Sequence, residues 1–377
     1  LDQLKAIAFF FVILGHMSIT GEPKNWIYSF HMPIFFFITG FNYNIEKLAQ
    51  TKPLDYLKKL CLRLLVPYVW MQLLSMCLRF LQKTVIQHTE VPVALYLRGM
   101  FRGHSRLVDA PSNPLYFVLV VFALTFACLP LSLFTETLRM RWHLNVVPAC
   151  ACMILFGWLL GQLYRANEEK IRSLRWWQRS IAVVLLLAFG AAVWYFNGRT
   201  SIHGNHWGED YTLAMLTAID TSTALALLCM KLPRLGWLNL AGQSTLLFMG
   251  FHKPVILILE ALFPAQKKTA LFLVCAAVGV YALMLPVSLW FRHFAPFVGG
   301  KDSDFADPFV RIGQAVCIVG ATCVPYLYFV NHLKGGLLRS TNLYLALAVA
   351  AYIVVCAVLY IVLRRFVRFP FLPQKKE

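Results

Sequence analysis

Two histidines and one lysine near the N-terminus have the types and spacing for acid–base chemistry inside a membrane. His16 ends an apolar run that begins at Leu4, and His31 opens a second apolar run that continues to Phe41. Lys5 lies at the far end of the first run. Ionisable side chains in segments apolar enough for a membrane are costly and usually tied to function. We therefore expect this hairpin to carry the chemistry of the chain.

The spacing of Lys5 and His16 predicts a ligand site that extends along one helix. Residues eleven apart on an α-helix lie about 20° apart around the axis and about 16 Å apart along it. A ligand spanning this distance would be long and thin, with a charged end beside the lysine and a reacting atom beside the histidine. Coenzyme A thioesters have this shape, so we expect acyl-CoA as the donor substrate.

The two histidines should lie at similar depth, because the turn over residues 17–27 makes their helices antiparallel. Pro33 is placed to open the second helix. A neutral imidazole of His16 could act as general base on an alcohol, and His31 could orient it or donate a hydrogen bond to developing negative charge. The alternative is a metal site, but no third ligand stands at a suitable spacing, so we expect no metal.

Composition indicates a protein of the membrane rather than an ordinary soluble domain. Of the 377 residues, 59% are hydrophobic and only 14% are charged, which also excludes a disordered chain. The net charge of +18 fits basic cytoplasmic loops facing anionic lipid, and it also fits a partner that carries several phosphates. Nothing indicates nucleic-acid binding, since no basic domain stands outside the apolar segments. The scattered cysteines have no metal or redox spacing.

Apolar windows predict an all-α polytopic membrane protein, a bundle of about 10–12 transmembrane helices. Eleven spans cannot place both termini on the same side of the membrane, so one further crossing is expected between residues 112 and 165. A broken or re-entrant element there would supply it, because buried irregular backbone is tolerated at membrane depth. The predicted spans are 3–19, 28–42, 61–82, 113–134, 146–164, 180–196, 211–229, 238–262, 270–292, 309–330 and 341–364.

Charge placement predicts the orientation of the chain. Residues 43–63 and the C-terminal tail are rich in Lys and Arg, so both should be cytoplasmic, with the N-terminus inside. The turn that joins the two histidine helices is then outside, as are the polar segments 83–112 and 197–210, which could contact a hydrophilic acceptor. We expect a multi-pass protein of the inner, or plasma, membrane, in contact with membrane lipids and with both termini cytoplasmic.

Two further ionisable residues lie within predicted spans. His252 is followed by Pro254, which breaks the backbone hydrogen-bond ladder and can open a polar pocket. Asp220 lies in the predicted span 211–229 and is expected to be functional or paired, for instance by orienting a histidine or closing an ion pair.

The order of these motifs resembles the acyltransferase 3 family of integral membrane O-acyltransferases. The resemblance covers roughly residues 1–300, which we expect to form the family's membrane domain, while residues 301–377 add two further helices and a basic cytoplasmic tail. It rests on these segments, quoted as they stand in this chain: Lys5-x10-His16, Phe30-His31-Met32-Pro33, Arg63-Leu64-Leu65-Val66-Pro67-Tyr68, Pro114-Leu115-Tyr116-Phe117, Phe156-Gly157-Trp158-Leu159-Leu160-Gly161, Asn197-Gly198-Arg199 and Gly242-Gln243-Ser244-Thr245 with Gly250-Phe251-His252-Lys253-Pro254.

The resemblance implies transfer of an acyl group, usually acetyl, from cytoplasmic acyl-CoA to a hydroxyl of an extracytoplasmic glycan or lipid-linked sugar. Two departures concern the donor site. Lys5 replaces the family's arginine and loses its bidentate fork, and Leu60 stands where the third helix would carry the first arginine of a pair. The implied site comprises His16 and His31 as catalytic residues, Lys5, Lys58, Lys59 and Arg63 as donor-binding residues, and His252, Asp220 and Asn113 as supporting residues.

The alternative function is a multi-span transporter or flippase of a glycan or small polar solute. Intramembrane His and Asp residues and proline-broken helices suit a substrate pathway. Against it, the two halves of the chain show no internal repeat, and the histidines gather at one hairpin. Release of free CoA thiol from acetyl-CoA would distinguish the enzyme from the transporter.

Overall fold

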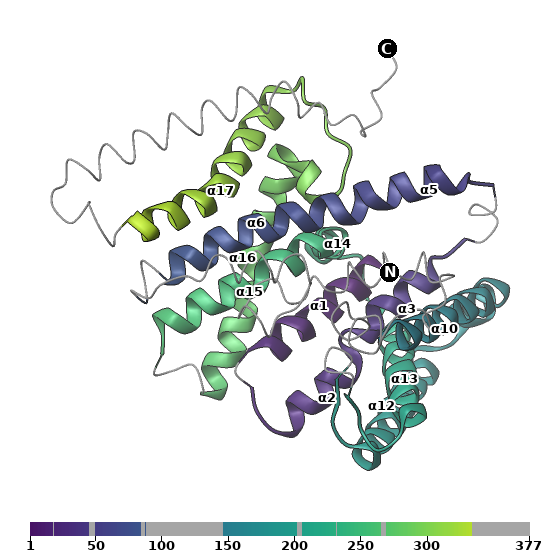
Figure 1. Ribbon diagram of the computed structural model, residues 1–377. Coiled ribbons are helices and arrows are strands. Elements are labelled where there is room, and N and C mark those ends of the chain that lie inside the picture. Colours follow the sequence, from purple (N-terminus) through teal and green to yellow (C-terminus); the bar gives the residue numbers. More distant parts are fainter. Residues whose placement is uncertain are drawn as a thin grey trace, which may run out of the picture.

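The protein is a helical bundle, shown in Figure 1 as a computed structural model. The structure describes residues 1–17, 19–44, 50–83, 87, 146–201, 206–230, 232–264 and 269–333. The predicted spans 113–134 and 341–364, and Asn113 with them, lie outside the described residues. So does most of the segment expected to contain a broken or re-entrant element.

Membrane-spanning character is confirmed by six helices in the described ranges that are long and apolar enough to cross a bilayer. The fold is therefore an all-α polytopic membrane protein. Four of the six follow their predicted spans closely: α10 (Val147–Ala166), α12 (Trp176–Asn197), α13 (Tyr211–Cys229) and α16 (Ala270–Phe294). The other two candidate spans are Leu54–Arg79 and Thr245–Leu262.

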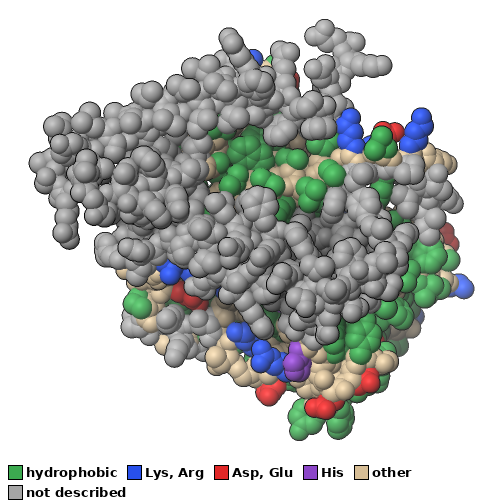
Figure 2. Space-filling view, in the orientation of Figure 1, with side chains coloured by type: hydrophobic (Ala, Val, Ile, Leu, Met, Phe, Trp, Pro, Cys, Tyr) green, Lys and Arg blue, Asp and Glu red, His purple; other side chains and the backbone are tan. Residues whose placement is uncertain are grey.

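The outer surface of the bundle is apolar, as a lipid-facing surface must be. Large hydrophobic side chains are exposed along α12 and α16, among them Val184, Phe189, Leu271 and Val278. Figure 2 shows hydrophobic side chains over much of the described surface, with charged side chains toward its upper and lower margins. The helices therefore present to lipid the residue types that a soluble protein would bury.

Two predicted spans are interrupted, which corrects the expectation of continuous helices. The predicted span 28–42 consists of α2 (Glu22–Phe30) and α3 (Pro33–Phe41), so part of the expected turn over residues 17–27 is helical. The predicted span 238–262 consists of α14 (Gly236–Gln243) and α15 (Thr245–Leu262). Prolines explain the first break and the start of α2, since Pro23 and Pro33 each stand in the first turn of a helix, where their missing N–H costs least.

The remaining elements connect these helices. A long rod is built from α5 (Pro53–Leu60), the π-helical turn η1 (Cys61–Leu65) and α6 (Val66–Leu81). It packs against α17 (Pro308–Leu333) and α15 (Figure 1). A short helix, α11 (Glu168–Ser173), joins α10 to α12, and the 3-10 turn η6 (Pro296–Gly299) follows α16. The segment between α12 and α13 contains an antiparallel pair of short strands, β1 (Thr200–Ser201) and β2 (His206–Trp207).

Helix α1 (Asp2–His16) is the centre of the bundle and packs against α2, α3, α13, α14, α15 and α16. Most of its side chains are buried, and Phe9 touches both Phe248 and His252 through edge-on ring contacts. Close to its first residues, a Cβ built on Gly242 of α14 would lie 1.9 Å from the carbonyl oxygen of Asp2. Only glycine permits that approach, so the start of α1 is fixed against α14.

Helices α3 and α10 make an equally close backbone contact. A Cβ built on Gly40 would lie 1.9 Å from the carbonyl oxygen of Ile154, and one built on Gly157 would lie 2.1 Å from the carbonyl oxygen of Phe37. Gly157 and Gly161 are four residues apart on one face of α10, the small-xxx-small spacing that allows membrane helices to approach closely. This contact fixes α3, and with it the position of His31.

We predict that Gly157→Ala destabilises the bundle while Gly279→Ala does not. The new methyl group at position 157 would overlap a backbone oxygen, and overpacking of this kind costs about 1–3 kcal/mol. Gly279 lies in α16 with no atom within 4 Å of an added Cβ. There alanine gains up to about 1 kcal/mol of helix propensity. Thermal unfolding of the two purified variants in one detergent measures the difference, and equal unfolding temperatures would contradict the packing argument.

Candidate active site

His31 lies in the two-residue gap between α2 and α3 and is 3% exposed. Its Nδ1 is 2.8 Å from the carbonyl oxygen of Ile27, four residues earlier. Because a carbonyl can only accept, Nδ1 carries the proton and donates it. The Nε2 atom is then left with a lone pair, which is the form of imidazole that can accept a proton.

His252 has the same local arrangement on α15. It is fully buried, and its Nδ1 donates to the carbonyl oxygen of Phe248 at 2.9 Å, again four residues earlier. Its Nε2 is buried and has no hydrogen-bond partner among the described residues. Buried polar atoms without a partner are uncommon and call for an explanation such as a catalytic role or an absent ligand.

His16 ends α1 beside both of these rings. The centre of its ring lies 6.3 Å from that of His31 and 5.3 Å from that of His252. The structure thus brings His16 and His31 together, as the hairpin predicted, and it adds His252 to the same cluster. We call these three residues the histidine cluster. No group of three or more His, Cys, Asp or Glu with metal-binding geometry occurs among the described residues.

The polar surroundings of His252 follow from Pro254. Proline has no N–H, so the carbonyl of Gly250 loses the donor that a regular helix would supply. The hydroxyl of Ser75 on α6 donates to this oxygen instead, at 2.9 Å. Ser75 is fully buried, and its hydrogen bond ties α6 to α15 at the level of the histidine cluster.

Tyr28 and a group of cations border the histidine cluster and were missed by the sequence analysis. The ring of Tyr28 lies 4.8 Å from that of His31, and the ammonium of Lys24 lies 5.7 Å from the centre of the Tyr28 ring. Strand β1 packs against α2, and Arg199, just before β1, is close enough to act electrostatically on Tyr28. Lys24 and Tyr28 are one helical turn apart on α2. Their proximity could be predicted only from a helix over these residues, and the sequence analysis expected a turn there.

Three of the four predicted donor-binding residues surround one large cavity. This cavity, of about 990 Å³, is lined by Lys58, Lys59 and Arg63, and Lys52 and Lys301 add two cations that the sequence analysis did not include. Asp55 and Asp302 also line it. We call it the basic cavity.

Lys5 and Asp220 lie apart from these two groups. The ammonium of Lys5 is 3.1 Å from a carboxylate oxygen of Asp2, and Lys5 does not line the basic cavity. Asp220 faces α12. A Cβ built on Gly190 of that helix would lie 3.5 Å from the Cβ of Asp220. Its Oδ2 is buried with no hydrogen-bond partner among the described residues. The roles assigned to Lys5 and Asp220 therefore stay predictions.

The histidine cluster and the basic cavity lie at different depths of one bundle. Val66 of α6 lines the basic cavity, whereas Ser75 of the same helix contacts the turn of α15 that carries His252. Nine residues of helix rise about 14 Å. A ligand with a charged end in the basic cavity would therefore need a thin extension of roughly this length to reach the imidazoles.

Asn197 and Asp210 hold together the two ends of the segment between α12 and α13, which lies beside α2. Asn197 is 1% exposed; its side chain donates to the carbonyl of Trp207 at 2.9 Å and accepts from the backbone N–H of Asp210 at 2.7 Å. Asp210 in turn caps α13 by accepting from the N–H groups of Thr212 and Leu213. The Asn197-Gly198-Arg199 motif therefore anchors this segment and sets where Arg199 lies.

The fold and the site together define a polytopic membrane protein with buried, unpaired acid–base groups. The sequence profile of one family, described as an acyltransferase domain, matches residues 1–144 and 105–293. The chain therefore belongs to the acyltransferase 3 family and is a membrane acyltransferase. Neither the curated proteins nor the solved structures gave a match.

We predict that the effect of Ser75→Ala depends on Pro254. In the natural chain, Ser75→Ala leaves the Gly250 carbonyl buried and without its donor, which costs about 1–3 kcal/mol. In a Pro254→Ala background the new backbone N–H satisfies that carbonyl, so the same substitution should cost much less. A double-mutant cycle of unfolding free energies measures the coupling. Equal costs in both backgrounds would show that the hydroxyl does not serve this carbonyl.

We also predict a pH-dependent effect of Asp210→Ala. The N–H groups of Leu213 and Thr212 hold the pKa of the Asp210 carboxyl below its ordinary value. A depressed folded-state pKa stabilises the fold above the unfolded-state pKa, and this contribution is lost as the pH falls through the folded-state value. The variant should therefore unfold at a lower temperature at pH 7, with a gap that narrows below about pH 4.

Asp210→Asn is the matched control, since asparagine still accepts the capping hydrogen bonds without a charge. At pH 7 its unfolding temperature should lie between that of wild type and that of Asp210→Ala. A gap between wild type and Asp210→Ala that stayed constant with pH would contradict the charge argument.

Proposed function

We propose that this membrane acyltransferase is an O-acyltransferase that moves an acyl group, acetyl in the first instance, from acyl-CoA to a hydroxyl of an extracytoplasmic glycan or lipid-linked sugar. The observation that carries the proposal is the histidine cluster, with two Nδ1 atoms bonded to backbone carbonyls and a buried, unpaired Nε2 on His252. Imidazoles in this form are suited to take a proton from an alcohol.

The basic cavity supports acyl-CoA as the donor. Five Lys and Arg side chains line it, against two acids, and such a surplus of positive charge suits the phosphates of a nucleotide. The rise of about 14 Å from this cavity to the level of His252 suits the thin arm between the nucleotide and the thioester. In this proposal the donor enters from the cytoplasm, and both termini are on that side of the inner membrane.

The proposed reaction needs one base and a stabilised oxyanion. His16 accepts the proton of the acceptor hydroxyl while its oxygen forms a bond to the thioester carbonyl carbon. The carbon–sulfur bond then breaks, the ester is formed, and the CoA thiolate leaves and takes up the proton from His16. His31 or His252 orients His16 by accepting a hydrogen bond at its unprotonated Nε2. The developing charge on the carbonyl oxygen is stabilised by a donor other than these two imidazoles.

Groups around Tyr28 support a hydrophilic acceptor on the opposite side from the donor. Tyr28 offers a hydroxyl, and Lys24 and Arg199 offer cationic hydrogen-bond donors beside the histidine cluster. Sugar hydroxyls are recognised by such groups, and acidic sugars by the two cations in particular.

The test is acyl transfer by His16→Ala. A positioned general base contributes about 10²–10⁴-fold to the rate, so the variant should lose acyl transfer by about that factor while its unfolding temperature is unchanged. His293→Ala is the matched control, because His293 is exposed in the last turn of α16. Two readouts are needed: release of free CoA thiol from acetyl-CoA, and the acyl mass on envelope glycans measured by mass spectrometry.

Full activity in His16→Ala would remove the base assignment. Movement of a glycan across the membrane with no thiol release from wild type would favour the transporter instead.

A further inference from the structure

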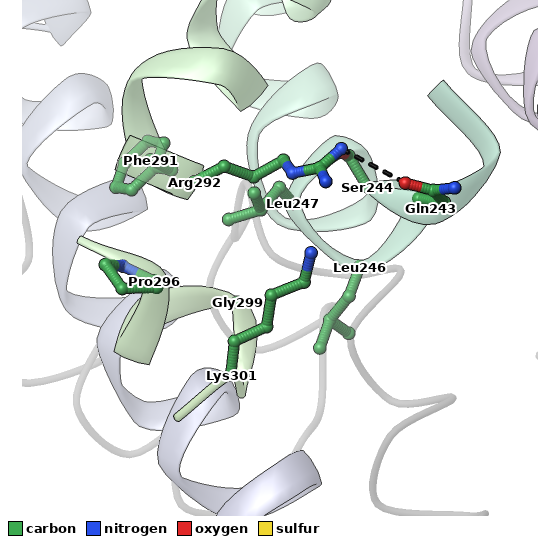
Figure 3. Close-up of a pocket in the computed structure, with 9 residues that line it drawn as sticks. All are labelled: Gln243, Ser244, Leu246, Leu247, Phe291, Arg292, Pro296, Gly299 and Lys301. Atoms are coloured by element: carbon green, nitrogen blue, oxygen red, sulfur yellow. Dashed lines mark hydrogen bonds between the residues drawn. The ribbon is translucent and has the colours of Figure 1, made fainter. Parts of the chain in front are cut away.

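A second, smaller cavity lies beside the basic cavity, at the start of α15. It has a volume of about 20 Å³ and is bordered by Ser244, Leu246 and Leu247 on one side and by Arg292 and Lys301 on the other. Figure 3 shows the Arg292 guanidinium and the Lys301 ammonium extending into the same space from different segments. Lys301 lines both cavities, so they share one wall.

The hydroxyl of Ser244 is an unexplained group in this small cavity. Ser244 is 3% exposed, and its Oγ has no hydrogen-bond partner among the described residues. It precedes α15, an 18-residue helix that begins at Thr245 with no side-chain cap. The first N–H groups of such a helix are left without helical partners and carry the positive end of its dipole. An anion in the cavity would meet this unpartnered hydroxyl.

The charges around the cavity are also unbalanced. Arg292 donates to the neutral side chain of Gln243 at 3.2 Å, and no acidic residue is among those that line the small cavity. Burial, and then the nearby charge of Arg292, lower the pKa of Lys301. Two cations held close together without an acid favour an anionic ligand between them.

We propose that Ser244, Arg292 and Lys301 bind a terminal phosphate monoester. The size of the cavity selects a terminal group, since about 20 Å³ accommodates little more than one water-sized group. One oxygen of a terminal phosphate can enter it. A phosphate within a diphosphate, which is bonded to further groups on both sides, cannot. A monoester also carries close to two negative charges, which matches the two cations.

Two sources can supply this group. The first is the ribose phosphate of the donor nucleotide in the basic cavity, in which case the inference rests on the proposed function. The second is the headgroup of a monoester phospholipid such as phosphatidic acid. In both cases the chemistry at Ser244 is the same.

The test compares ligands that differ by the one phosphate. The full-length protein in detergent is titrated with CoA and with dephospho-CoA, which lacks the ribose phosphate. Arg292→Gln should weaken CoA binding about 10- to 100-fold, the range for one lost charge-assisted hydrogen bond, and leave dephospho-CoA binding unchanged. Lys301→Gln should weaken CoA binding more than dephospho-CoA binding, since Lys301 also lines the basic cavity. Ser244→Ala should have a smaller effect in the same direction. Arg234→Gln, an exposed arginine preceding α14, is the matched control.

A second arm tests the lipid source. The same variants are placed in nanodiscs that contain phosphatidic acid or phosphatidylglycerol, and the thermal shift that each lipid gives is measured. If the variants lose a preference for phosphatidic acid while they bind CoA as wild type does, the proposed phosphate site is supported and its ligand is a lipid headgroup. If wild type does not bind CoA, the proposed donor fails and this arm alone decides the inference. Variants that change neither the CoA discrimination nor the lipid preference would overturn it.

Discussion

The site depends on one repeated interaction, an imidazole that donates its Nδ1 proton to the carbonyl four residues earlier. His31 and His252 both do so, and each is followed two residues later by a proline, Pro33 or Pro254. A bilayer offers no water to satisfy backbone groups, so a helix break at membrane depth persists only where protein supplies the partners. The gap between α2 and α3 at His31 and the interrupted hydrogen-bond ladder of α15 at Pro254 therefore both lie inside the bundle, and each imidazole keeps an unprotonated Nε2.

The third imidazole is positioned by a different device. His16 is the last residue of a continuous helix, and it is fixed only as firmly as that helix is fixed. A backbone contact through glycine does this at the start of α1, where Gly242 meets Asp2, and a second one fixes α3, the helix after His31, where Gly40 meets Ile154. Close backbone approach stabilises membrane helices through van der Waals packing rather than through the hydrophobic effect. The geometry of the histidine cluster is thus set by residues that carry no chemistry.

The sequence predicted the parts of the site that depend on local pattern. The apolar runs and their histidines predicted a hairpin with His16 and His31 at similar depth, and the rings are 6.3 Å apart. Basic residues near the third span predicted a cationic region, and Lys58, Lys59 and Arg63 line one cavity. Both predictions follow from the cost of placing charge in a membrane. Because of that cost, ionisable residues are rare in apolar runs and are easily recognised in the sequence.

What the sequence could not predict depends on contacts between distant segments. Ser75 meets Gly250 across 175 residues, and no periodicity links the two. Lys301 joins the cations of α5 only because the turn after α16 folds back against α6. The break at Ser244 was missed because the polar residues around it carry no charge and no proline stands there, so the segment from 238 to 262 resembles a single span.

If position 5 binds the donor, as the resemblance implies, a lysine there in place of arginine has a physical consequence. An ammonium is a compact charge without the planar fork of a guanidinium, and that of Lys5 is already 3.1 Å from the Asp2 carboxylate. A paired lysine attracts a phosphate less than an unpaired one does. In the proposed mechanism, most of the phosphate binding therefore falls to the cations of the basic cavity. The ligand is then held by its charged end through several contacts, while its reacting end lies about 14 Å further into the bundle, at the level of the imidazoles. Binding energy from the charged end is in this way used to bring a weakly polar thioester to the base.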